Sequence, residues 1–481
     1  MKVATYNVGD PRFAPRPTLA DLAGASDLLA LYSPFGAVRE VDLYPALGGQ
    51  LPGLQGITAP FDLDRYVEFA AGRHGLQTKL RQQIQSGGKG LSATEAVFSA
   101  LGEFAERFFA LLTWLARRED LRLASYCELA ESHDPLPPLE LLVPFAPEQH
   151  AEPLPYPHLT PDTPIAWMPA RHVRSGIKTF VPSQQVCLFH FVLPGETVVS
   201  PATSGGLACG STFEAAVLNG VNELVERDTL NLSWHARLPG RRVPLESIRF
   251  PGRAGRLAET VRRIAPDTVV VRHETDLPDF AVVSAHRFVR GRSELAFSCG
   301  TAASVDPARA FAGAIVELFQ TEHPQSLARL VPDWAASEMS QRIAAQSIKA
   351  AEALGNVADR INLYGYPEFY ERVRDDLVPT ETTDLEPAPA EDTADEFERA
   401  LGALERRGID PIVVDMLPDD YLTGRHHLSV TKVVIPELTP LNVPPFRLLG
   451  HPRYRTIRRD LGLQETITEF HELRHDELPF P

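Results

Sequence analysis

Three stretches of the chain carry apolar residues at helical spacing, and each follows a run rich in small residues. The first spans residues 93–118 after SGGKGLS, the second ends near Arg237 after TSGGLACGST, and the third spans residues 308–320 after FSCGTAASVD. Apolar residues three and four positions apart share one face of a helix. The pattern therefore predicts three long helices, each entered from a strand or a tight turn.

Short apolar runs predict strands elsewhere. They lie in residues 36–51, in CLFHFVLP and in PIVVDML, whereas residues 331–377 have a helical pattern. Prolines crowd residues 135–164, and residues 379–396 are acidic and contain proline. Proline at this density breaks helices and central strands, so both segments are predicted to be surface loops or linkers. The mixture of helices and strands predicts a mixed α/β fold.

The composition is that of a globular protein with ample length for a large core, since 44% of its 481 residues are hydrophobic. A net charge of −16, without any block of Lys and Arg, argues against nucleic acid and anionic membranes as partners. No apolar run approaches the ~20 residues of a membrane span, and the N-terminus does not resemble a signal peptide. The four cysteines form no CxxC pair, so reduced thiols and a cytoplasmic location are predicted.

Two short motifs match known sites only in part. Gly88-Lys89 has Gln83 where a Walker-type phosphate loop needs glycine, and Gly90 where that loop needs a hydroxyl residue. The HELRH pattern at residues 471–475 is formally that of zinc hydrolases, but six residues after it are too few for the following helix that supplies a third ligand. Its histidines are predicted to be solvated residues on a closing strand.

The first two predicted helices share an E-x-x-E-R pattern: Glu103-x-x-Glu106-Arg107 and Glu223-x-x-Glu226-Arg227. One interpretation is an ion-paired, half-exposed helix face, because Glu/Arg pairs at i,i+4 are common. The other is that the two sets face each other and suit a hard divalent cation such as magnesium, with substrate phosphates completing its coordination. Arg107, Arg227 and Lys89 would then neutralise phosphate oxygens.

The segments that carry this chemistry follow one another in a characteristic order: GKGLSATEAVFSALGEFAER, TSGGLACGSTFEAAVLNGVNELVERD and DPARAFAGAIVELFQ. In this order the chain resembles the YcaO family, whose members bind ATP at a carboxylate-magnesium site unrelated to Walker loops. The resemblance covers the chain from about Tyr32 onward. It implies a YcaO-type fold over residues 32–481, with sheets and long acidic helices around an ATP/magnesium cleft, after an N-terminal extension at residues 1–31.

The resemblance also implies roles for single residues. It assigns nucleotide binding to Lys89, Ser99, Glu103, Arg107, Glu223, Arg227 and Glu317, and magnesium binding to Glu103, Glu106, Glu223 and Glu226. Azoline-forming members of the family end in a proline-rich tail that enters the active site. Pro479 and Pro481 match that tail in part and are the catalytic candidates, although Glu477 stands where its first proline would be.

The activity that the resemblance implies is ATP-dependent activation of a peptide amide. A neighbouring Cys, Ser or Thr side chain, or external sulfide or amine, adds to the carbonyl carbon, the amide oxygen is phosphorylated, and loss of phosphate leaves an azoline, thioamide or amidine. The implied partners are a ribosomally made precursor peptide, a separate ubiquitin-activating-like protein that presents its leader, and an FMN-dependent dehydrogenase that oxidises the azoline in some systems. A homodimer within a larger complex is also implied.

Two positions depart from the family pattern. Ala215 stands where a glutamate is usual, with Glu214 one step earlier on the helix, and Gly313 stands where an arginine is common. One residue turns a side chain by ~100° around a regular helix, so Glu214 is not an equivalent of the missing glutamate. Ser211-x-x-Glu214 is instead predicted to be a capping box. Two hypotheses follow for the chain, an ATP-dependent cyclodehydratase acting on Cys, Ser or Thr and a YcaO-like scaffold without ATPase activity; a thioamide- or amidine-forming enzyme is a third.

Overall fold

The computed structural model describes residues 27–29, 31–32, 37–45, 54–60, 86–132, 135–288, 297–328, 364, 367–387, 393–417, 428–443, 446–463 and 466–480. These residues form helices and three antiparallel sheets, which confirms the mixed α/β fold. Most of the predicted N-terminal extension and most of the helical pattern at residues 331–377 lie outside the described residues.

The three sheets each have a defined strand order. The smallest has the order β1-β2-β3 and consists of β1 (Val38–Pro45), β2 (Leu54–Pro60) and β3 (Gly87–Gly90). A second has the order β11-β10-β9-β8 and consists of β8 (Gly240–Val243), β9 (Val269–His273), β10 (Ala281–Phe288) and β11 (Phe297–Ser304). The largest has the order β4-β5-β12-β13-β7, with β6 paired to β5, and consists of β4 (Arg122–Ala124), β5 (Ile165–His172), β6 (Lys178–Pro182), β7 (Leu207–Gly210), β12 (Ile412–Asp415) and β13 (Ser429–Val434).

The three predicted long helices are present as α3 (Ala93–Arg117), α6 (Phe213–His235) and α8 (Pro307–Ala328). The shorter helices are α4 (Tyr126–Ser132), α5 (Ser183–Val186), α7 (Gly252–Ile264), α13 (Pro367–Leu377), α14 (Thr393–Glu405) and α16 (Arg453–Asp460). Single 3-10 turns lie at Arg118–Asp120, Leu139–Leu141, Pro147–Ala151 and Phe470–Glu472.

Each long helix follows a strand that stands at one end of its sheet, so the fold contains three strand-to-helix units: β3–α3 (unit 1), β7–α6 (unit 2) and β11–α8 (unit 3). Strand and helix pack very closely in these units. A Cβ atom at Gly88 would lie 2.4 Å from the Ala96 carbonyl oxygen, and one at Gly300 would lie 2.4 Å from that of Ala314. Glycine is therefore required on both strands.

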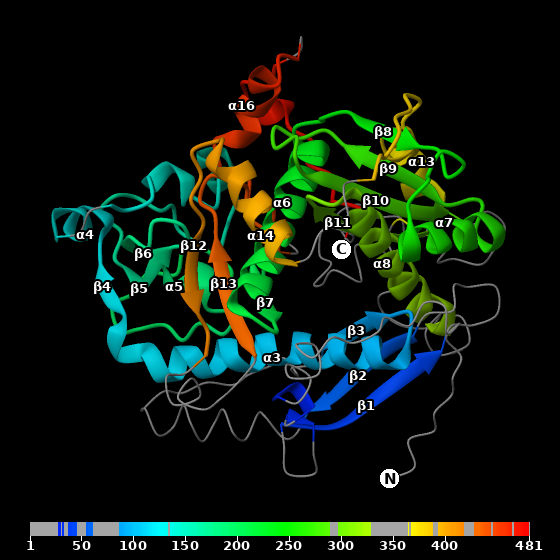
Figure 1. Ribbon diagram of the computed structural model, residues 1–481. Helices are drawn as coiled ribbons and strands as arrows, with labels where there is room; N and C mark the ends of the chain where they lie inside the picture. The colour runs from blue at the N-terminus through cyan, green and yellow to red at the C-terminus, as the bar shows by residue number, and fades with distance from the viewer. Residues whose placement is uncertain are drawn as a thin grey trace.

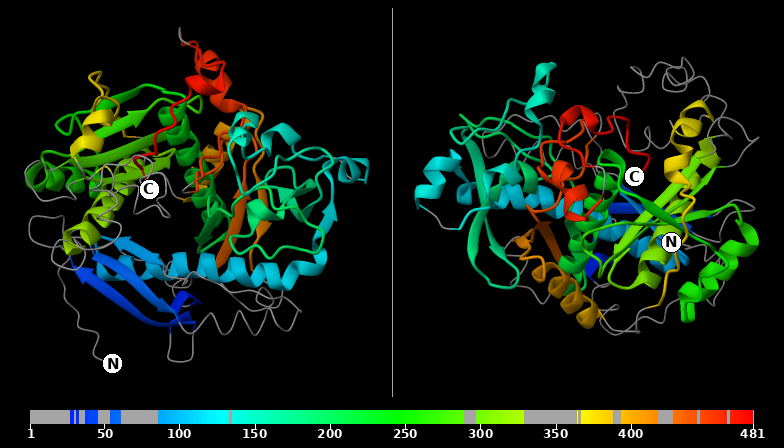
Figure 2. Two further views of the ribbon diagram at one scale, coloured as in Figure 1. Left: turned by 180° about the vertical axis from the view of Figure 1, so that it is seen from behind. Right: turned by 90° about the horizontal axis from the view of Figure 1, so that it is seen from above.

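The helices hold the three sheets together. In Figure 1, α3 runs along the base of the molecule, and α6 and α8 rise from it. The left view of Figure 2 shows α3 reaching from the three-stranded sheet to the largest sheet. Helix α6 packs between the four-stranded sheet and the largest sheet, because Val221 shares one buried cluster with Val282 of β10 and Val433 of β13. This packing brings the acidic helices together.

Several local predictions were wrong. The run CLFHFVLP forms no strand. The predicted linker at residues 379–396 includes the start of α14, where Glu396 is buried. The HELRH residues form a 3-10 turn and a loop rather than a strand, and the His475 ring nitrogen Nε2 lies 3.2 Å from the Phe470 carbonyl oxygen. These segments gain their structure from tertiary packing, which local propensity does not report.

Candidate functional site

The three strand-to-helix units carry glutamates at equivalent positions. Residues Ser92, Thr212 and Asp306 precede α3, α6 and α8, and the eleventh residue after each of them is Glu103, Glu223 and Glu317. Three residues further on lie Glu106, Glu226 and Gln320, followed directly by Arg107, Arg227 and Thr321. The E-x-x-E-R pattern of units 1 and 2 thus becomes E-x-x-Q-T in unit 3.

The first glutamate of each unit is fixed by a backbone amide that precedes its own helix. The hydrogen bonds are Gly87 N to Glu103 Oε2 at 3.2 Å, Gly206 N to Glu223 Oε2 at 3.0 Å and Thr301 N to Glu317 Oε2 at 2.7 Å. A backbone amide that donates to a carboxylate forms a charge-assisted bond and fixes the side-chain orientation. The repeated bond shows that the three units are built alike.

A second set of contacts joins each unit to the next. Cys209 N of β7 donates to Glu106 Oε1 of α3 at 2.9 Å, and Thr301 Oγ1 of β11 donates to Glu226 Oε1 of α6 at 2.6 Å. The circle closes where Lys89 Nζ of β3 lies 3.3 Å from Glu317 Oε1 of α8. The predicted acidic residues therefore meet in one ring of three units, which we call the carboxylate ring: Glu103, Glu106, Glu223, Glu226 and Glu317.

Burial makes three of these carboxylates hard to ionise. Burial, with further contributions from Glu103 and Glu223, holds the pKa of Glu106 well above its ordinary value. Burial likewise raises the pKa of Glu223 and of Glu226, although Arg227 acts in the opposite direction on both. A raised carboxyl pKa means that the charged form lacks sufficient compensation.

The fifth carboxylate differs because cations surround it. Burial raises the pKa of Glu317, but Lys89 and Arg227 outweigh that effect, and the net pKa lies below the ordinary value. Glutamates in turn raise the pKa of the buried Arg227 guanidinium. Unit 3 thus contributes an ionised carboxylate to a site in which Glu106, Glu223 and Glu226 resist ionisation.

The cations in the ring are fewer than the carboxylates. Arg107 lies 2.6 Å from Glu103, Arg227 lies 3.5 Å from Glu226, and Lys89 pairs with Glu317. Lys432 of β13 lies near Glu223; its ammonium donates to the Thr203 carbonyl at 2.7 Å, and burial lowers its pKa to about 8. Lys432 was not among the residues predicted from the sequence, although a lysine inside the apolar run SVTKVVIP is a signal for a buried cation.

The donor chemistry of the ring fits magnesium and a polyphosphate. Magnesium prefers one or two carboxylates with substrate phosphates completing its coordination, and Arg and Lys bind phosphate oxygens. Among the described residues, no three His, Cys, Asp or Glu side chains lie close enough to hold an ion as they stand. The carboxylates instead occupy separate anchors around the ring, so Glu103, Glu106, Glu223, Glu226 and Glu317 would hold such a group jointly with its phosphates.

Ser99, also predicted to bind nucleotide, supports the ring from α3. Its hydroxyl oxygen accepts a hydrogen bond from Lys89 N at 3.2 Å. This bond fixes the backbone of β3 where Lys89 turns toward Glu317. Ser99 therefore contacts the backbone of Lys89, another residue predicted to bind the nucleotide.

The two departures from the family pattern have clear structural settings. Thr212 is the N-cap of α6 and accepts from Ala215 N at 3.1 Å, so the predicted Ser211 capping box is wrong by one residue. Glu214 is exposed and does not replace the glutamate missing at Ala215. A Cβ atom at Gly313 would lie 2.8 Å from the Ala302 Cβ, so β11 leaves little room there for a larger side chain.

The C-terminal tail ends beside β11. The Cys299 thiol donates to the Pro479 carbonyl oxygen at 3.2 Å, and Trp234 Nε1 donates to the Asp476 carbonyl oxygen at 2.9 Å. Because Cys299 and Thr301 are alternate residues of one strand, Pro479 reaches the strand that anchors Glu226 and Glu317. Pro481 lies outside the described residues.

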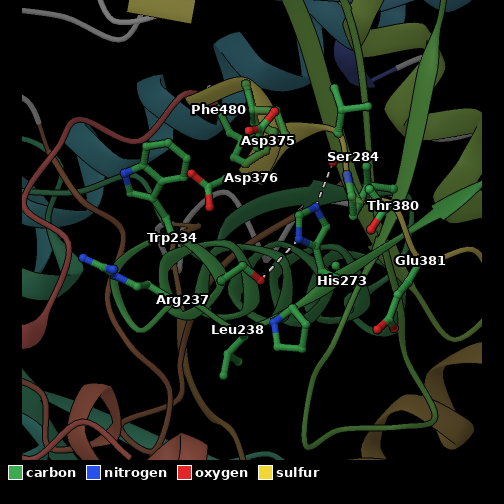
Figure 3. Close-up of a pocket in the computed structure, with 17 residues that line it drawn as sticks. Trp234, Arg237, Leu238, His273, Ser284, Asp375, Asp376, Thr380, Glu381 and Phe480 are labelled. Atoms are coloured by element: carbon green, nitrogen blue, oxygen red, sulfur yellow. Dashed lines mark hydrogen bonds between the residues drawn. The ribbon is translucent and has the colours of Figure 1, made fainter. Parts of the chain in front are cut away.

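A pocket of about 500 Å³ adjoins the tail, and Phe480 belongs to its wall. Figure 3 shows His273 pointing toward Ser284 in this pocket. The His273 ring lies 3.2 Å from the Ser233 hydroxyl and 2.8 Å from that of Ser284, and burial lowers its pKa to about 4. The tail is thus seated between this pocket and β11.

Comparison with known families assigns the chain. The sequence model of the YcaO cyclodehydratases, described as ATP- and Mg2+-binding, matches residues 87–439. The chain belongs to the YcaO family. ATP and magnesium, the predicted cofactors, are the ligands that this description names. No curated protein matches the chain in sequence at a significant level.

Solved structures share the YcaO fold at low identity. A heterocyclase in complex with substrate and cofactor has a TM-score of 0.69 and 20% identity, covering 98% of this chain and 60% of the heterocyclase. The heterocyclase TruD has a TM-score of 0.57 and 20% identity, covering 80% of this chain and 50% of TruD. YcaO from Methanopyrus kandleri, bound with AMPPCP and Mg2+, has a TM-score of 0.52 and 18% identity, covering 84% of this chain and 86% of that protein.

These likenesses establish the fold. The chain spans 60% and 50% of the length of the first two structures. In the part of the chain that the structure describes, no helix combines the length and the apolar character needed to cross a membrane.

Proposed function

We propose that this YcaO protein uses ATP to activate a backbone amide of a ribosomally made precursor peptide, and cyclises a Cys, Ser or Thr side chain onto it to form an azoline. The observation that carries the proposal is the carboxylate ring, in which Glu106, Glu223 and Glu226 have raised pKa values in a chain that belongs to the cyclodehydratase family. The fold is also that of a heterocyclase with substrate and cofactor.

The acidic and the basic residues of the ring would bind different parts of the magnesium-ATP complex. When bound, ATP with magnesium would supply the phosphoryl group that turns the amide oxygen into a leaving group. The five glutamates would hold the metal jointly with the ATP phosphates, while Lys89, Arg107 and Arg227 would neutralise phosphate oxygens. Fixed charges of this kind stabilise the charge that develops during phosphoryl transfer. Each glutamate is already fixed by a backbone amide or a hydroxyl, which keeps the ring in place before ligands arrive.

The tail supplies the side of the site that faces the peptide. The hydrogen bond from Cys299 to Pro479 keeps the tail against β11, and Phe480 is buried at the adjoining pocket. A proline residue has no backbone N–H that needs a partner, and its carbonyl oxygen can accept a hydrogen bond from a substrate amide. We propose Pro479 and Pro481 as the residues that contact the amide to be activated.

The proposal extends to partners. The substrate would be a precursor peptide, and a separate ubiquitin-activating-like protein would present its leader. An FMN-dependent dehydrogenase would act after ring closure where azoles are made. Homodimer formation and a cytoplasmic location stay predictions.

Calorimetric titration with AMPPCP and magnesium tests the proposal directly. We expect micromolar binding in the unsubstituted protein and its loss in Glu103→Gln, because the amide keeps the hydrogen bond from Gly87 but removes the charge. Glu119→Gln, at an exposed glutamate just after α3, is the matched control and should bind normally. Absence of binding by the unsubstituted protein, also with its peptide-presenting partner, would contradict the ATP-dependent activity.

A second candidate function is a YcaO scaffold that binds peptide and partner without ATP turnover. It is favoured by Ala215, by the exposed Glu214 and by the packing of Gly313 against Ala302. ATPase measurement with and without Ala215→Glu separates the two candidates. No turnover in the parent protein and turnover in the variant would identify a decayed site. Gly313→Arg is unsuitable for this test because its Cβ would meet Ala302.

A further inference from the structure

The hydroxyl of Thr301 occupies a special place in the carboxylate ring. Thr301 lies on β11 and is 2% exposed. Its Oγ1 lies 2.6 Å from Glu226 Oε1 of α6 and 3.3 Å from Glu317 Oε2 of α8. Its backbone N–H donates to the same Glu317 oxygen at 2.7 Å. One residue therefore contacts carboxylates from two different helices.

The other two units have no such bridge among the contacts described. In unit 1, Glu103 accepts from Gly87 N, and in unit 2, Glu223 accepts from Gly206 N. Neither donor is a side chain, and Gly87 and Gly206 have none to offer. Glu106 is held by a backbone amide as well, that of Cys209. Thr301 alone in this set adds a hydroxyl that reaches a second helix.

The chemistry of a hydroxyl suits this position. A threonine hydroxyl has one hydrogen to donate and two lone pairs that accept, so it can bond to a carboxyl group in either protonation state. The contacts of 2.6 and 3.3 Å place this hydroxyl between the two carboxyl groups, so the separation of Glu226 and Glu317 is fixed before any cation binds. The strand itself is fixed, because the Thr321 hydroxyl lies 2.6 Å from the Cys299 carbonyl oxygen and accepts from Cys299 N at 3.2 Å.

We propose that Thr301 is a positioning residue of the metal-nucleotide site: it holds Glu226 of α6 and Glu317 of α8 at the separation from which both carboxylates serve one bound divalent cation and its phosphates. The inference rests on the proposed function of the ring. It assigns to unit 3 the task of joining the two helices, because the Thr301 hydroxyl contacts a carboxyl group of each. The sequence pattern of the family elements does not include this residue.

Mn2+ binding in the presence of AMPPCP, followed by the electron paramagnetic resonance of free Mn2+, tests the inference without turnover. We expect Thr301→Val, which replaces the hydroxyl by a methyl group of similar size, to weaken Mn2+ binding about tenfold, as for loss of a hydrogen bond to a charged group. Thr301→Ser keeps the hydroxyl and should bind Mn2+ within about twofold of the parent protein.

Thr431→Val is the matched control. Thr431 is another fully buried strand threonine, and its hydroxyl has no hydrogen-bond partner among the described residues. Its substitution should leave Mn2+ affinity unchanged. If Thr301→Val does not fold, the pair Thr301→Ser and Thr301→Ala decides, because these two side chains differ only in the hydroxyl; the thermal unfolding midpoint reports folding of each variant.

The outcomes separate the two proposals. Equal Mn2+ affinity in Thr301→Val and the parent protein, or equal losses in the Ser and Ala variants, would overturn the positioning role and leave the proposed function intact. Failure of the parent protein itself to bind Mn2+ with AMPPCP would overturn both. A tenfold loss in Val and Ala with recovery in Ser would establish that the hydroxyl positions the two carboxylates.

Discussion

Units 1 and 2 differ from unit 3 in how they handle charge, although all three are built alike. The first two each bring two glutamates and one arginine to the ring. The third brings one glutamate, and Gln320 and Thr321 occupy the helix positions of the second glutamate and the arginine. Three of the four glutamates in units 1 and 2 have raised pKa values, whereas the pKa of Glu317 is lowered by Lys89 and Arg227. Units with similar backbones thus shift the pKa values of their glutamates in opposite directions.

The comparison shows which residues of the repeated strand-to-helix unit can change without altering its backbone. The backbone amide that holds the first glutamate is kept in all three units, because it depends on the close approach of strand and helix. The residues three and four positions later are not needed for that contact. They can therefore change from Glu and Arg to Gln and Thr while the unit keeps its shape, and the charge of the ring becomes asymmetric.

The largest expected loss of activity comes from substituting a glutamate whose pKa is raised. Glu226→Gln keeps an oxygen for the Thr301 hydroxyl but removes a charge that magnesium would need. We expect azoline formation and ATP turnover to fall about 100-fold or more, the scale of losing one fixed electrostatic contact in an active site. Rates with a precursor peptide and partner measure this, with Glu119→Gln as the control. A change below about threefold would contradict a role for unit 2 in catalysis.

A smaller loss of nucleotide affinity is expected from substituting Lys89 of unit 1, which pairs with Glu317 of unit 3. Lys89→Gln removes the ion pair with Glu317, whose pKa should then rise, and removes a cation for phosphate. AMPPCP binding should weaken about tenfold, as for one charge-assisted hydrogen bond. Titration calorimetry measures the affinity, and Lys178→Gln, at an exposed lysine of β6, is the control. Unchanged affinity in Lys89→Gln would show that Lys89 only pairs with Glu317.

The smallest effect concerns stability in the absence of metal. A carboxyl whose folded-state pKa is raised favours folding when protonated, so its contribution is lost as pH rises from its ordinary value of 4.5 through the raised value. Glu106→Gln removes this titration. The free energy of unfolding should then fall less steeply with pH than in the parent protein, by at most about 1.4 kcal/mol per pH unit.

Denaturant unfolding of the metal-free protein at several pH values measures that slope. Carboxylates outside the ring titrate alike in both proteins, so the comparison isolates Glu106 together with the ring groups that its charge affects. Identical slopes would mean that the Glu106 charge is compensated in the folded protein, and the claim of uncompensated charge in unit 1 would be wrong.

The sequence alone determined the three long helices, the mixed α/β class and the family. The helical spacing of apolar residues is a local property, and E-x-x-E-R occurs in two of the predicted helices, so both features can be recognised without a structure. The same reading missed unit 3 as a repeat, because Gln320 and Thr321 hide the pattern in its helix. Aligning FSCGTAAS with the glycine-containing strands of the other units was the available signal.

Only the tertiary structure decided which carboxylates meet and what their charges do. Glu106 contacts β7 of the next unit, and Glu226 contacts β11, across 103 and 75 residues of chain. No local pattern encodes such pairs, since they depend on α6 packing between two sheets. Burial and neighbouring charges then set each pKa, and both arise from the folded surroundings. The sequence named the glutamates, and the packing of three units made them a ring with Thr301 between two of its members.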